Sequence, residues 1–374
     1  MIIAREIQNH VENTLFKGKI VIIYGARQVG KTTLVKEILK RYPKDSLYLS
    51  CDEIDIRQAL TDKTSTELKA FLGNRRLVIL DEAQRVKNIG LTLKLLVDNF
   101  SAMQVIATGS SSFDLANKIS EPLTGRKKEF YLYPLSLAEL NSVYSALEMD
   151  RILERRIIYG MYPEIINDGA EAEEKLKSLA QSYAHKDILQ YQNIKNPEIL
   201  EKLLQALALQ IGNEVSYNEL ASLIGVDKNT AANYIQILEK AFIIFRLKPF
   251  SRNLRNELKK LRKIYFYDTG IRNALINNMN PLRLRQDAGA LWENFMISER
   301  IKHNSNQGYD FNIYFWRTRQ KQEIDYLEEE RGVLRGFEFK WKKDKFKIPR
   351  TFLATYQGSR VELVNRDNYK KFFK

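Results

Sequence analysis

Short apolar runs alternate with helical patterns through the first third of the 374-residue chain. Each run is rich in β-branched and aromatic side chains and has the length of a buried strand. The expected strands cover residues 19–24, 46–50, 77–80 and 104–108. Apolar residues at helical spacing separate them, beginning with Ile7, Val11 and Leu15 in a lead-in helix. This alternation predicts an α/β fold built on a parallel sheet.

Beyond residue 134 the pattern changes to helical segments and then to a mixed segment. Helices are expected over 134–158 and 175–211, with a sharp break at 159–164. A helix near 289–302 precedes expected strands at 314–317, 323–327 and 336–340. We therefore predict three domains: a parallel α/β domain, a helical region and a small α/β domain, covering residues 1–166, 167–283 and 284–374.

The composition adds a charge imbalance to this picture. Lysine and arginine number 60 against 46 acidic residues, which gives a formal charge of +14 and a pI near 9.5. This favours an anionic partner, although a general solubility charge explains it equally well. No apolar run approaches the ~20 residues of a membrane span, and no signal-peptide core is found. With a single cysteine, Cys51, the chain is predicted to be cytoplasmic and not to contact a membrane.

The first candidate site follows the first expected strand, where residues 24–34 read YGARQVGKTTL. A strand, then Gly25-x-x-x-x-Gly30-Lys31-Thr32, then a helix is the context of a phosphate-binding loop. Backbone N–H groups and the helix N-terminus favour phosphate oxygens there. We expect Lys31 to contact the β- and γ-phosphates of ATP and the Thr32 hydroxyl to bind Mg²⁺. The predicted nucleotide-binding residues are Gly25, Ala26, Arg27, Gln28, Val29, Gly30, Lys31, Thr32 and Thr33.

An acidic pair forms the second nucleotide motif. Asp81 and Glu82 follow the buried run at 77–80, so Asp81 is predicted to hold Mg²⁺ and Glu82 to polarise the attacking water. A complete strand at 47–50 stands between the two motifs along the chain. This spacing is typical of ATPases with an inserted strand and a catalytic glutamate, the ASCE or AAA+ type of P-loop NTPase.

Three further positions are open to two interpretations each. The run at 104–108 is expected to lie beside the loop strand, so Thr108 or Ser110 would either sense the γ-phosphate or cap the following helix. Arg126, in cis or from a neighbouring subunit, is a candidate arginine finger, and Arg27 is its rival. For each arginine, a solvated surface position is the competing interpretation.

Together these segments resemble the prokaryotic AAA-type ATPases that carry a DUF4143 C-terminal region. The segments are GARQVGKTTL, LVILDEAQ, ATGSSSFDL, LTGRKKEFYLYPLSLAEL and YGMYPEII. The resemblance spans nearly the whole chain, and the stretch 108–139 is its most specific part. It implies an ATP-binding and ATP-hydrolysing cytoplasmic module. It assigns nucleotide chemistry to Gly25, Gly30, Lys31, Thr32, Asp81, Glu82 and, less directly, Arg126.

Residues 213–266 have the order of a winged helix-turn-helix. A Ser216–Glu219 capping box opens one helix, Gly225 turns the chain, and a second helix carries Ala232, Ile235 and Leu238 inward. A strongly basic hairpin follows. Either this module binds DNA, or it packs subunits with a solvated hairpin. The candidate DNA contacts are Lys228, Asn229 and Asn233 to bases, and Arg252, Arg255 and Lys259 to phosphates.

The last region resembles the restriction-endonuclease-like PD-(D/E)xK constellation. Glu293 opens a helix, Asp325 lies on one strand, and Glu338-x-Lys340 lies on the next, with both side chains on one face. Ile324 stands where the family name has proline. Asp325 and Glu338 would hold a second Mg²⁺, with Glu293 nearby, and Lys340 would orient water against a phosphodiester. The alternative is a domain of this fold that binds without cutting.

These motifs lead to two hypotheses. In the first, an ATPase couples its nucleotide state to DNA binding through the winged helix and the nuclease-like tail. In the second, a nucleotide-dependent switch or assembly protein carries a tail that only binds nucleic acid or protein. ATP and Mg²⁺ are the expected cofactors, DNA the expected partner, and a homo-oligomer is required if Arg126 acts in trans.

Overall fold

The computed structural model describes residues 2–110, 119, 123–169, 171–182, 197–251, 262–318, 320–342 and 345–373. These residues form two compact units. Unit 1 contains Met1–Leu135 with Lys240–Phe242, and unit 2 contains Ser136–Glu239 with Ile243–Lys374. Each unit has its own sheet.

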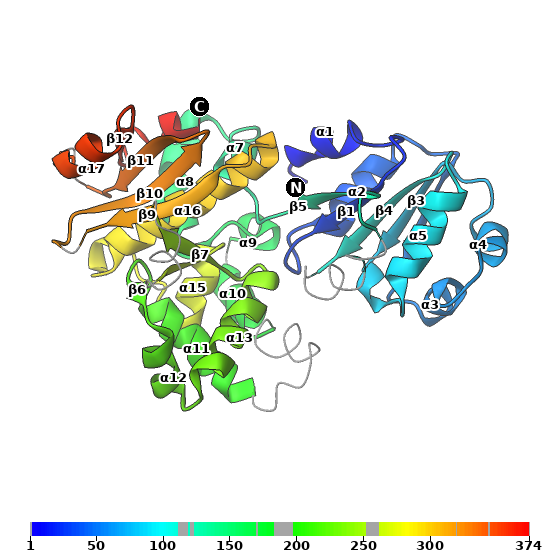
Figure 1. Ribbon diagram of the computed structural model, residues 1–374, viewed down its shortest axis with the longest axis horizontal. Helices are drawn as coiled ribbons and strands as arrows, with labels where there is room; N and C mark the ends of the chain where they lie inside the picture. Colours follow the sequence, from blue (N-terminus) through cyan, green and yellow to red (C-terminus); the bar gives the residue numbers. More distant parts are fainter. Residues whose placement is uncertain are drawn as a thin grey trace. The chain divides into compact units, whose positions relative to one another are not determined.

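The described strands of unit 1 form one parallel sheet in the order β2-β3-β4-β1-β5 (Figure 1). They are β1 (Ile20–Tyr24), β2 (Ser46–Ser50), β3 (Leu77–Asp81), β4 (Gln104–Gly109) and β5 (Lys127–Tyr131). Every residue of β1, β3 and β4 is buried, as expected for strands covered on both faces. The predicted parallel α/β fold is confirmed, and β4 lies beside β1 as expected.

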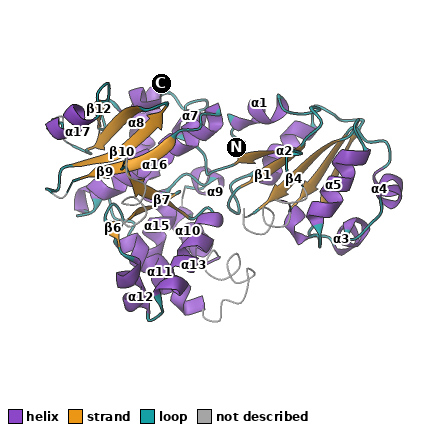
Figure 2. Ribbon diagram, viewed as in Figure 1, coloured by secondary structure: helices purple, strands orange, loops and turns teal. Residues whose placement is uncertain are grey.

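Helices separate the strands of unit 1, as Figure 2 shows. They are α1 (Ile7–Glu12), α2 (Lys31–Leu39), α3 (Ile54–Leu60), α4 (Ser65–Leu72), α5 (Ile89–Asn99) and the short 3₁₀ turn η1 (Ala83–Arg85). Helix α4 starts at a capping box in which Thr64 and Glu67 bond each other's backbone N–H groups. The lead-in helix α1 buries Ile7 and Val11, and Leu15 is buried beyond its end.

The described strands of unit 2 form a second sheet in the order β12-β11-β10-β9-β7-β8-β6. They are β6 (Glu214–Val215), β7 (Ile244–Pro249), β8 (Arg262–Phe266), β9 (Asn312–Arg317), β10 (Glu323–Glu330), β11 (Val333–Phe339) and β12 (Arg360–Val364). Strand β7 pairs with β9 through Lys248 opposite Tyr314 and Pro249 opposite Phe315. The hairpin predicted as a wing and the strands predicted as a separate tail therefore share one sheet.

The helices of unit 2 begin earlier than the predicted boundary at residue 166. They are α7 (Leu137–Leu140), α8 (Ala146–Tyr159), α9 (Pro163–Asn167), α10 (Ala172–Ser182), α11 (Pro197–Leu209), α12 (Tyr217–Ile224), α13 (Lys228–Lys240), α15 (Thr269–Leu275), α16 (Ala288–Gln307) and α17 (Arg350–Thr355), with the short turns η3 (Leu282–Leu284) and η4 (Tyr369–Phe373). Helix α8 packs against α15 and α16. The chain from Ser136 to residue 166 thus belongs to unit 2, because its partners lie more than a hundred residues downstream.

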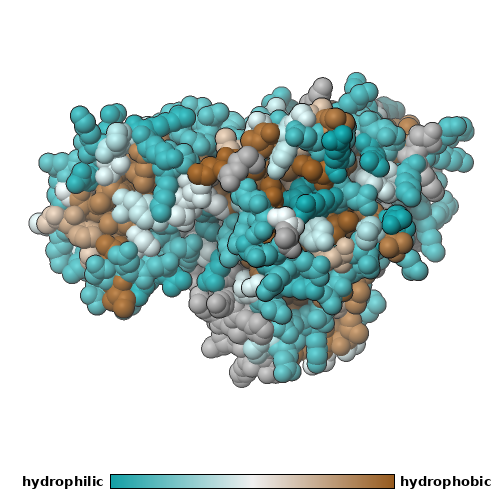
Figure 3. Space-filling view, turned by 180° about the vertical axis from the view of Figure 1, so that it is seen from behind, coloured by the Kyte–Doolittle hydropathy of each residue, from teal (hydrophilic) through white to brown (hydrophobic). Residues whose placement is uncertain are grey.

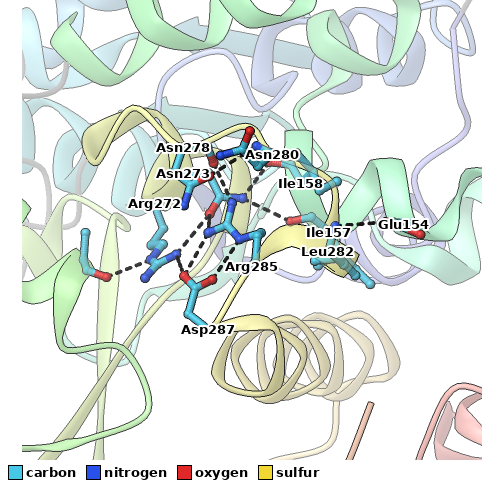
Figure 4. A network of polar contacts seen from close by, with 11 residues as sticks. Glu154, Ile157, Ile158, Arg272, Asn273, Asn278, Asn280, Leu282, Arg285 and Asp287 are labelled. Carbon is cyan, nitrogen blue, oxygen red and sulfur yellow. Dashed lines mark hydrogen bonds and ion pairs between the residues drawn. The ribbon is translucent and has the colours of Figure 1, made fainter. Parts of the chain in front are cut away.

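A buried ion network fixes the entry to α16 (Figure 4). Asp287, the residue before the helix, accepts hydrogen bonds from Arg285 Nε and Nη2, each 2.8 Å long, and from Arg272. Arg285 also donates to the Asn273 side chain at 2.9 Å, and Asn273 donates to the Ile158 carbonyl at 2.8 Å. The network connects α8, α15 and α16.

The surface follows the usual pattern for a folded chain. The face shown in Figure 3 is mostly hydrophilic, with hydrophobic residues exposed in several places. Among the described residues, no helix combines the length and the apolarity that crossing a bilayer requires.

Two glycines in equivalent helical positions give a matched test of packing. Gly270 and Gly289 are each the second residue of a helix. A Cβ on Gly270 would lie 2.3 Å from the Tyr159 carbonyl oxygen, whereas one on Gly289 meets no atom within 4 Å. We expect Gly270→Ala to lower the free energy of unfolding by about 2 kcal/mol or more. Gly289→Ala should be neutral or stabilise by about 0.5–1 kcal/mol. Urea unfolding of both variants measures this, and equal effects would contradict it.

The Asp287 network predicts a pH dependence of stability. Burial alone would raise the pKa of Asp287, but hydrogen bonds from Arg285 and Arg272 lower it from 3.8 to about 2. The stabilisation is therefore complete above about pH 4 and is lost as the pH falls towards 2. We expect Asp287→Asn to lower the free energy of unfolding by about 3 kcal/mol at pH 7.

The difference between wild type and Asp287→Asn should narrow between pH 4 and pH 2 in urea unfolding. Asp310→Asn is the control, because Asp310 is exposed and should change stability by less than about 0.5 kcal/mol. A difference for Asp287→Asn that stays constant over this range would exclude a role for the Asp287 charge.

Candidate active site

The loop between β1 and α2 has the backbone that a phosphate-binding loop needs. Gly30 has φ of 99°, a left-handed conformation that glycine adopts without strain. A Cβ on Gly25 would lie 2.2 Å from the Leu132 carbonyl oxygen, so a side chain there would displace the backbone after β5. The two glycines of the motif therefore serve different purposes, one for the turn and one for close packing.

Lys31 lies inside this loop. The residue is 5% exposed, and its Nζ donates to the carbonyl oxygens of Gly25 and Ala26, both at 2.9 Å. The same Nζ lies 3.9 Å from Glu82 Oε1. The ammonium is thus held where the loop closes, next to the acidic pair.

Asp81 accepts hydrogen bonds from hydroxyl groups on three neighbouring segments. Thr32 of α2 and Tyr48 of β2 donate to Asp81 Oδ2 at 2.7 and 2.6 Å, and Thr108 of β4 donates to Oδ1 at 2.5 Å. Burial, followed by the hydrogen bond to Asp81, raises the pKa of Tyr48, so its phenol stays a donor. Thr32 and Asp81, the two predicted Mg²⁺ ligands, are thus in direct contact.

Glu82 follows with a strained backbone. Its φ is 54°, its N–H donates to Thr108 Oγ1 at 3.0 Å, and its Oε2 accepts from Gln84 Nε2 at 2.5 Å. Gln84 Nε2 also donates to Ser110 Oγ at 3.0 Å. A left-handed non-glycine residue of this kind typically occurs where function fixes a side chain. The carboxylate is held between Lys31 and Gln84.

Three residues of this site were not predicted from the sequence: Arg5, Tyr48 and Gln84. The Arg5 guanidinium donates to the Val29 and Tyr133 carbonyls, both at 2.6 Å, and so ties the loop to the chain after β5. The only sequence signal for Tyr48 was its place on a strand expected in the same sheet. Gln84 lies two residues after Glu82, but a glutamine is common in such positions by chance. None of these contacts can be read from spacing alone.

Arg126 does not lie with the phosphate loop. It precedes β5, whose Lys127 is in register with Ile20, whereas the loop follows Tyr24 at the other end of β1. The separation along the strand is about 13 Å, and Arg126 Nε is 2.7 Å from Asp98 Oδ1. This position argues against a finger in cis. Of the other loop residues, Arg27 is partly buried and Thr33 is exposed.

The predicted DNA-binding surface is described only in part. Lys228, Asn229 and Asn233 are exposed on α13, whose N-terminus is capped by Asp227 through the backbone N–H groups of Asn229 and Thr230. The buried face of α13 carries Ala231, Ile235 and Leu238, so Ala231 takes the inward place expected for Ala232. Arg252, Arg255 and Lys259 lie outside the described residues.

The predicted tail residues lie close together in unit 2, and Lys263, which was not predicted, lies among them. Lys340 Nζ is 2.6 Å from Glu338 Oε1, and Glu293 and Asp325 both contact the buried Lys263. Burial, followed by the charges of Glu293 and Glu338, raises the pKa of Asp325 well above its usual range. Among the described residues, no group of three or more His, Cys, Asp and Glu could hold a metal ion. The second Mg²⁺ site predicted at Asp325 and Glu338 therefore does not fit this arrangement.

Three protein-family models match successive segments of the chain. Residues 17–141 match an AAA domain, residues 150–282 match a domain of unknown function (DUF8612), and residues 288–369 match another (DUF4143). The AAA match contains the loop, Asp81 and Glu82, and the DUF4143 match contains Glu293, Asp325 and Glu338.

Two relatives align with most of the chain. The uncharacterized protein Rv2008c of Mycobacterium tuberculosis is 26% identical over 344 residues, which cover 91% of this chain and 74% of the relative. The uncharacterized protein MJ1544 of Methanocaldococcus jannaschii is 26% identical over 345 residues, 87% of this chain and 75% of the relative.

Among solved structures, the RuvB Holliday junction branch migration motor of Thermotoga maritima is 16% identical, with a TM-score of 0.33. The alignment covers 69% of this chain and 95% of that structure. The fold assignment of unit 1 rests instead on its own strand order and on the AAA match over residues 17–141. The chain thus joins a segment that matches an AAA domain to a C-terminal segment that matches DUF4143.

Proposed function

We propose that the protein is an ATPase whose active site is the loop of residues 25–32 together with Asp81 and Glu82. The observation that carries this proposal is that Thr32 donates to Asp81 and Lys31 lies 3.9 Å from Glu82, at the carboxyl edge of a parallel sheet. Nucleotides bind at this edge in open α/β sheets, where helix N-termini favour phosphate.

The residues present fit Mg²⁺ and ATP. The left-handed Gly30 and the N-terminus of α2 leave backbone N–H groups for phosphate oxygens, and Lys31 supplies the positive charge. Thr32 and Asp81 already share a hydrogen bond and would hold Mg²⁺, which, when bound, neutralises charge on the phosphates. Tyr48 and Thr108 orient the Asp81 carboxylate from the strands on either side of β3.

Glu82 is the proposed general base. Its carboxylate would accept a proton from the water that attacks the γ-phosphate. Gln84 and Lys31 hold that carboxylate in place, and the bond from the Glu82 N–H to Thr108 fixes its backbone. Thr108, expected either to sense the phosphate or to cap a helix, is placed by these bonds to orient the acidic pair.

For unit 2 we propose nucleic-acid binding, with DNA as the partner. The supporting observation is the exposed polar end of α13, where Lys228, Asn229 and Asn233 lie apart from the buried face of Ala231, Ile235 and Leu238. A helix, a turn, a second helix and a hairpin follow one another in the order of a winged helix. The whole chain has a formal net charge of +14. The runner-up is a nucleotide-dependent switch or assembly protein whose unit 2 binds protein. Arg126 acting in trans would require a homo-oligomer.

Substitutions in the acidic pair and in the loop should have separable effects on ATP turnover. We expect Glu82→Gln to lower kcat by about 10²–10⁴-fold while ATP still binds, because only the base is removed. Lys31→Ala should lower turnover by at least about 100-fold and also weaken ATP binding. Phosphate release gives kcat, and a fluorescent ATP analogue gives the affinity.

Lys40→Ala is the matched control, because Lys40 directly follows the same helix, is exposed, and is not part of the loop. It should retain turnover within about twofold. If Lys31→Ala and Glu82→Gln both hydrolyse ATP at the wild-type rate, the proposed active site is wrong.

DNA binding by unit 2 should depend steeply on salt. We expect the triple change Arg252/Arg255/Lys259→Ala to reduce the slope of log K against log salt concentration by about 1 for each phosphate contact removed. Asn229→Ala with Asn233→Ala should instead reduce discrimination between DNA sequences. Fluorescence anisotropy with a labelled duplex measures both.

The control is Lys17/Lys69/Lys87→Ala, which removes the same charge from exposed positions of unit 1. It should change the slope by much less than one. Equal slopes for both triple variants would show that Arg252, Arg255 and Lys259 do not contact DNA. Absence of DNA binding at low salt would favour the switch or assembly protein whose unit 2 binds protein.

A further inference from the structure

Lys263 occupies the centre of the acidic cluster in unit 2. Its side chain is 2% exposed, and Nζ lies 2.5 Å from Glu323 Oε1, 3.1 Å from Glu293 Oε1 and 3.8 Å from Asp325 Oδ1. These carboxylates come from α16 and β10, whereas Lys263 comes from β8. One ammonium therefore joins separate parts of the sheet and its covering helix.

The surroundings of Lys263 suit a permanent cation. Its Nζ lies 5.6 Å from the centre of the Phe315 ring, within the range of a cation–π contact. Tyr265, two residues along β8, donates its hydroxyl to the same Glu293 Oε1 at 2.5 Å. Burial lowers the pKa of Lys263, but Tyr265, Glu293, Asp325 and Glu323 more than offset this, and the ammonium stays charged.

The carboxylate oxygens that a divalent ion would need are already used. Glu293 is shared by Lys263 and Tyr265, Asp325 Oδ2 accepts the Phe339 N–H at 3.0 Å, and Glu338 Oε1 contacts Lys340. Mg²⁺ requires near-octahedral oxygen ligands at about 2.0–2.1 Å and retains waters. A dication placed among these carboxylates would also face the Lys263 ammonium at close range.

One oxygen shows where the cluster is incomplete. Glu338 is 6% exposed, and its Oε2 has no hydrogen-bond partner among the described residues. A buried carboxylate oxygen without a donor is costly, and such groups call for an explanation. The acidic residues predicted to bind a metal are thus gathered around a lysine side chain, and one of their oxygens has no donor.

We propose that the Lys263 ammonium takes the place of a divalent metal ion in this cluster, so that the DUF4143 region is a metal-independent module that does not cut nucleic acid. Removing the ammonium should convert the cluster into a divalent-cation site formed by Glu293, Asp325 and Glu338. Lys263 holds β8 to α16 and β10 in the way that a structural metal would. This inference does not depend on ATP hydrolysis in unit 1.

Titration of the nucleotide-free protein with Mn²⁺ alone tests the inference. Wild type and Asp325→Asn should bind Mn²⁺ identically by calorimetry, because unit 2 contributes no site. Lys263→Met, similar in volume but uncharged, should gain a Mn²⁺ site that Lys263→Met/Asp325→Asn lacks. At a Mn²⁺ concentration 100-fold above Kd, the Tm of Lys263→Met should rise by about 5–10 °C.

The matched control is Lys302→Met. Lys302 is equally buried in the same unit, and its Nζ lies 2.6 Å from Glu299 Oε1. It should be destabilised without gaining a Mn²⁺ site. A Mn²⁺ site gained equally by both methionine variants would show that loss of any buried lysine creates it, and would overturn the inference.

Wild-type measurements keep the inference testable if Lys263→Met does not fold. A Mn²⁺ site in the wild type that is lost in Asp325→Asn would overturn it. So would Mg²⁺- or Mn²⁺-dependent nicking of supercoiled DNA that Asp325→Asn abolishes. Wild-type protein with neither property, and a folded Lys263→Arg variant that also has neither, would support it.

Discussion

In a parallel sheet every strand ends at the same edge, and the chemistry of unit 1 depends on this constraint. Strands β1, β3 and β4 therefore deliver the phosphate loop, Asp81 and Thr108 to one line. The Asp81 carboxylate then binds hydroxyls from segments that lie far apart in the chain. A single acidic side chain thus connects the loop helix to its neighbouring strands, and its position follows from sheet direction.

In both units, each of three buried lysine ammonium groups lies against carbonyl or carboxylate oxygens. Lys31 is held by carbonyl oxygens of its own loop, Lys302 by Glu299, and Lys263 by Glu293, Glu323 and Asp325. Removing one partner from such a pair costs far more than forming the pair gains, because the remaining charge stays buried. In unit 1 the ammonium lies where phosphate would bind. In unit 2 it lies among carboxylates, which makes the two sites chemically opposite.

The elements of unit 2 were predicted better than their organisation. The capping box at Ser216, the turn at Gly225 and the two helices around it follow from local sequence, and the structure contains α12 and α13 there. The hairpin β7–β8, however, leaves an open edge, and β9 covers it from more than sixty residues downstream. An unpaired strand edge can be completed by any compatible strand, so the local sequence does not say which strand does so. The predicted boundary between the hairpin and the tail therefore missed the pairing of β7 with β9.

The sequence alone indicated the parallel α/β fold of unit 1 and singled out Lys31, Thr32, Asp81 and Glu82, because motif spacing and the alternation of apolar runs with helical patterns are local properties. Tertiary structure decided the rest. It placed Arg126 at the far edge of the sheet, added Arg5, Tyr48 and Gln84 to the site, and put Lys263 among Glu293, Glu323 and Asp325. Apart from the bond between Gln84 and Glu82, those contacts join residues 24 to 128 positions apart. Which buried charge faces which partner is settled only when the chain is packed.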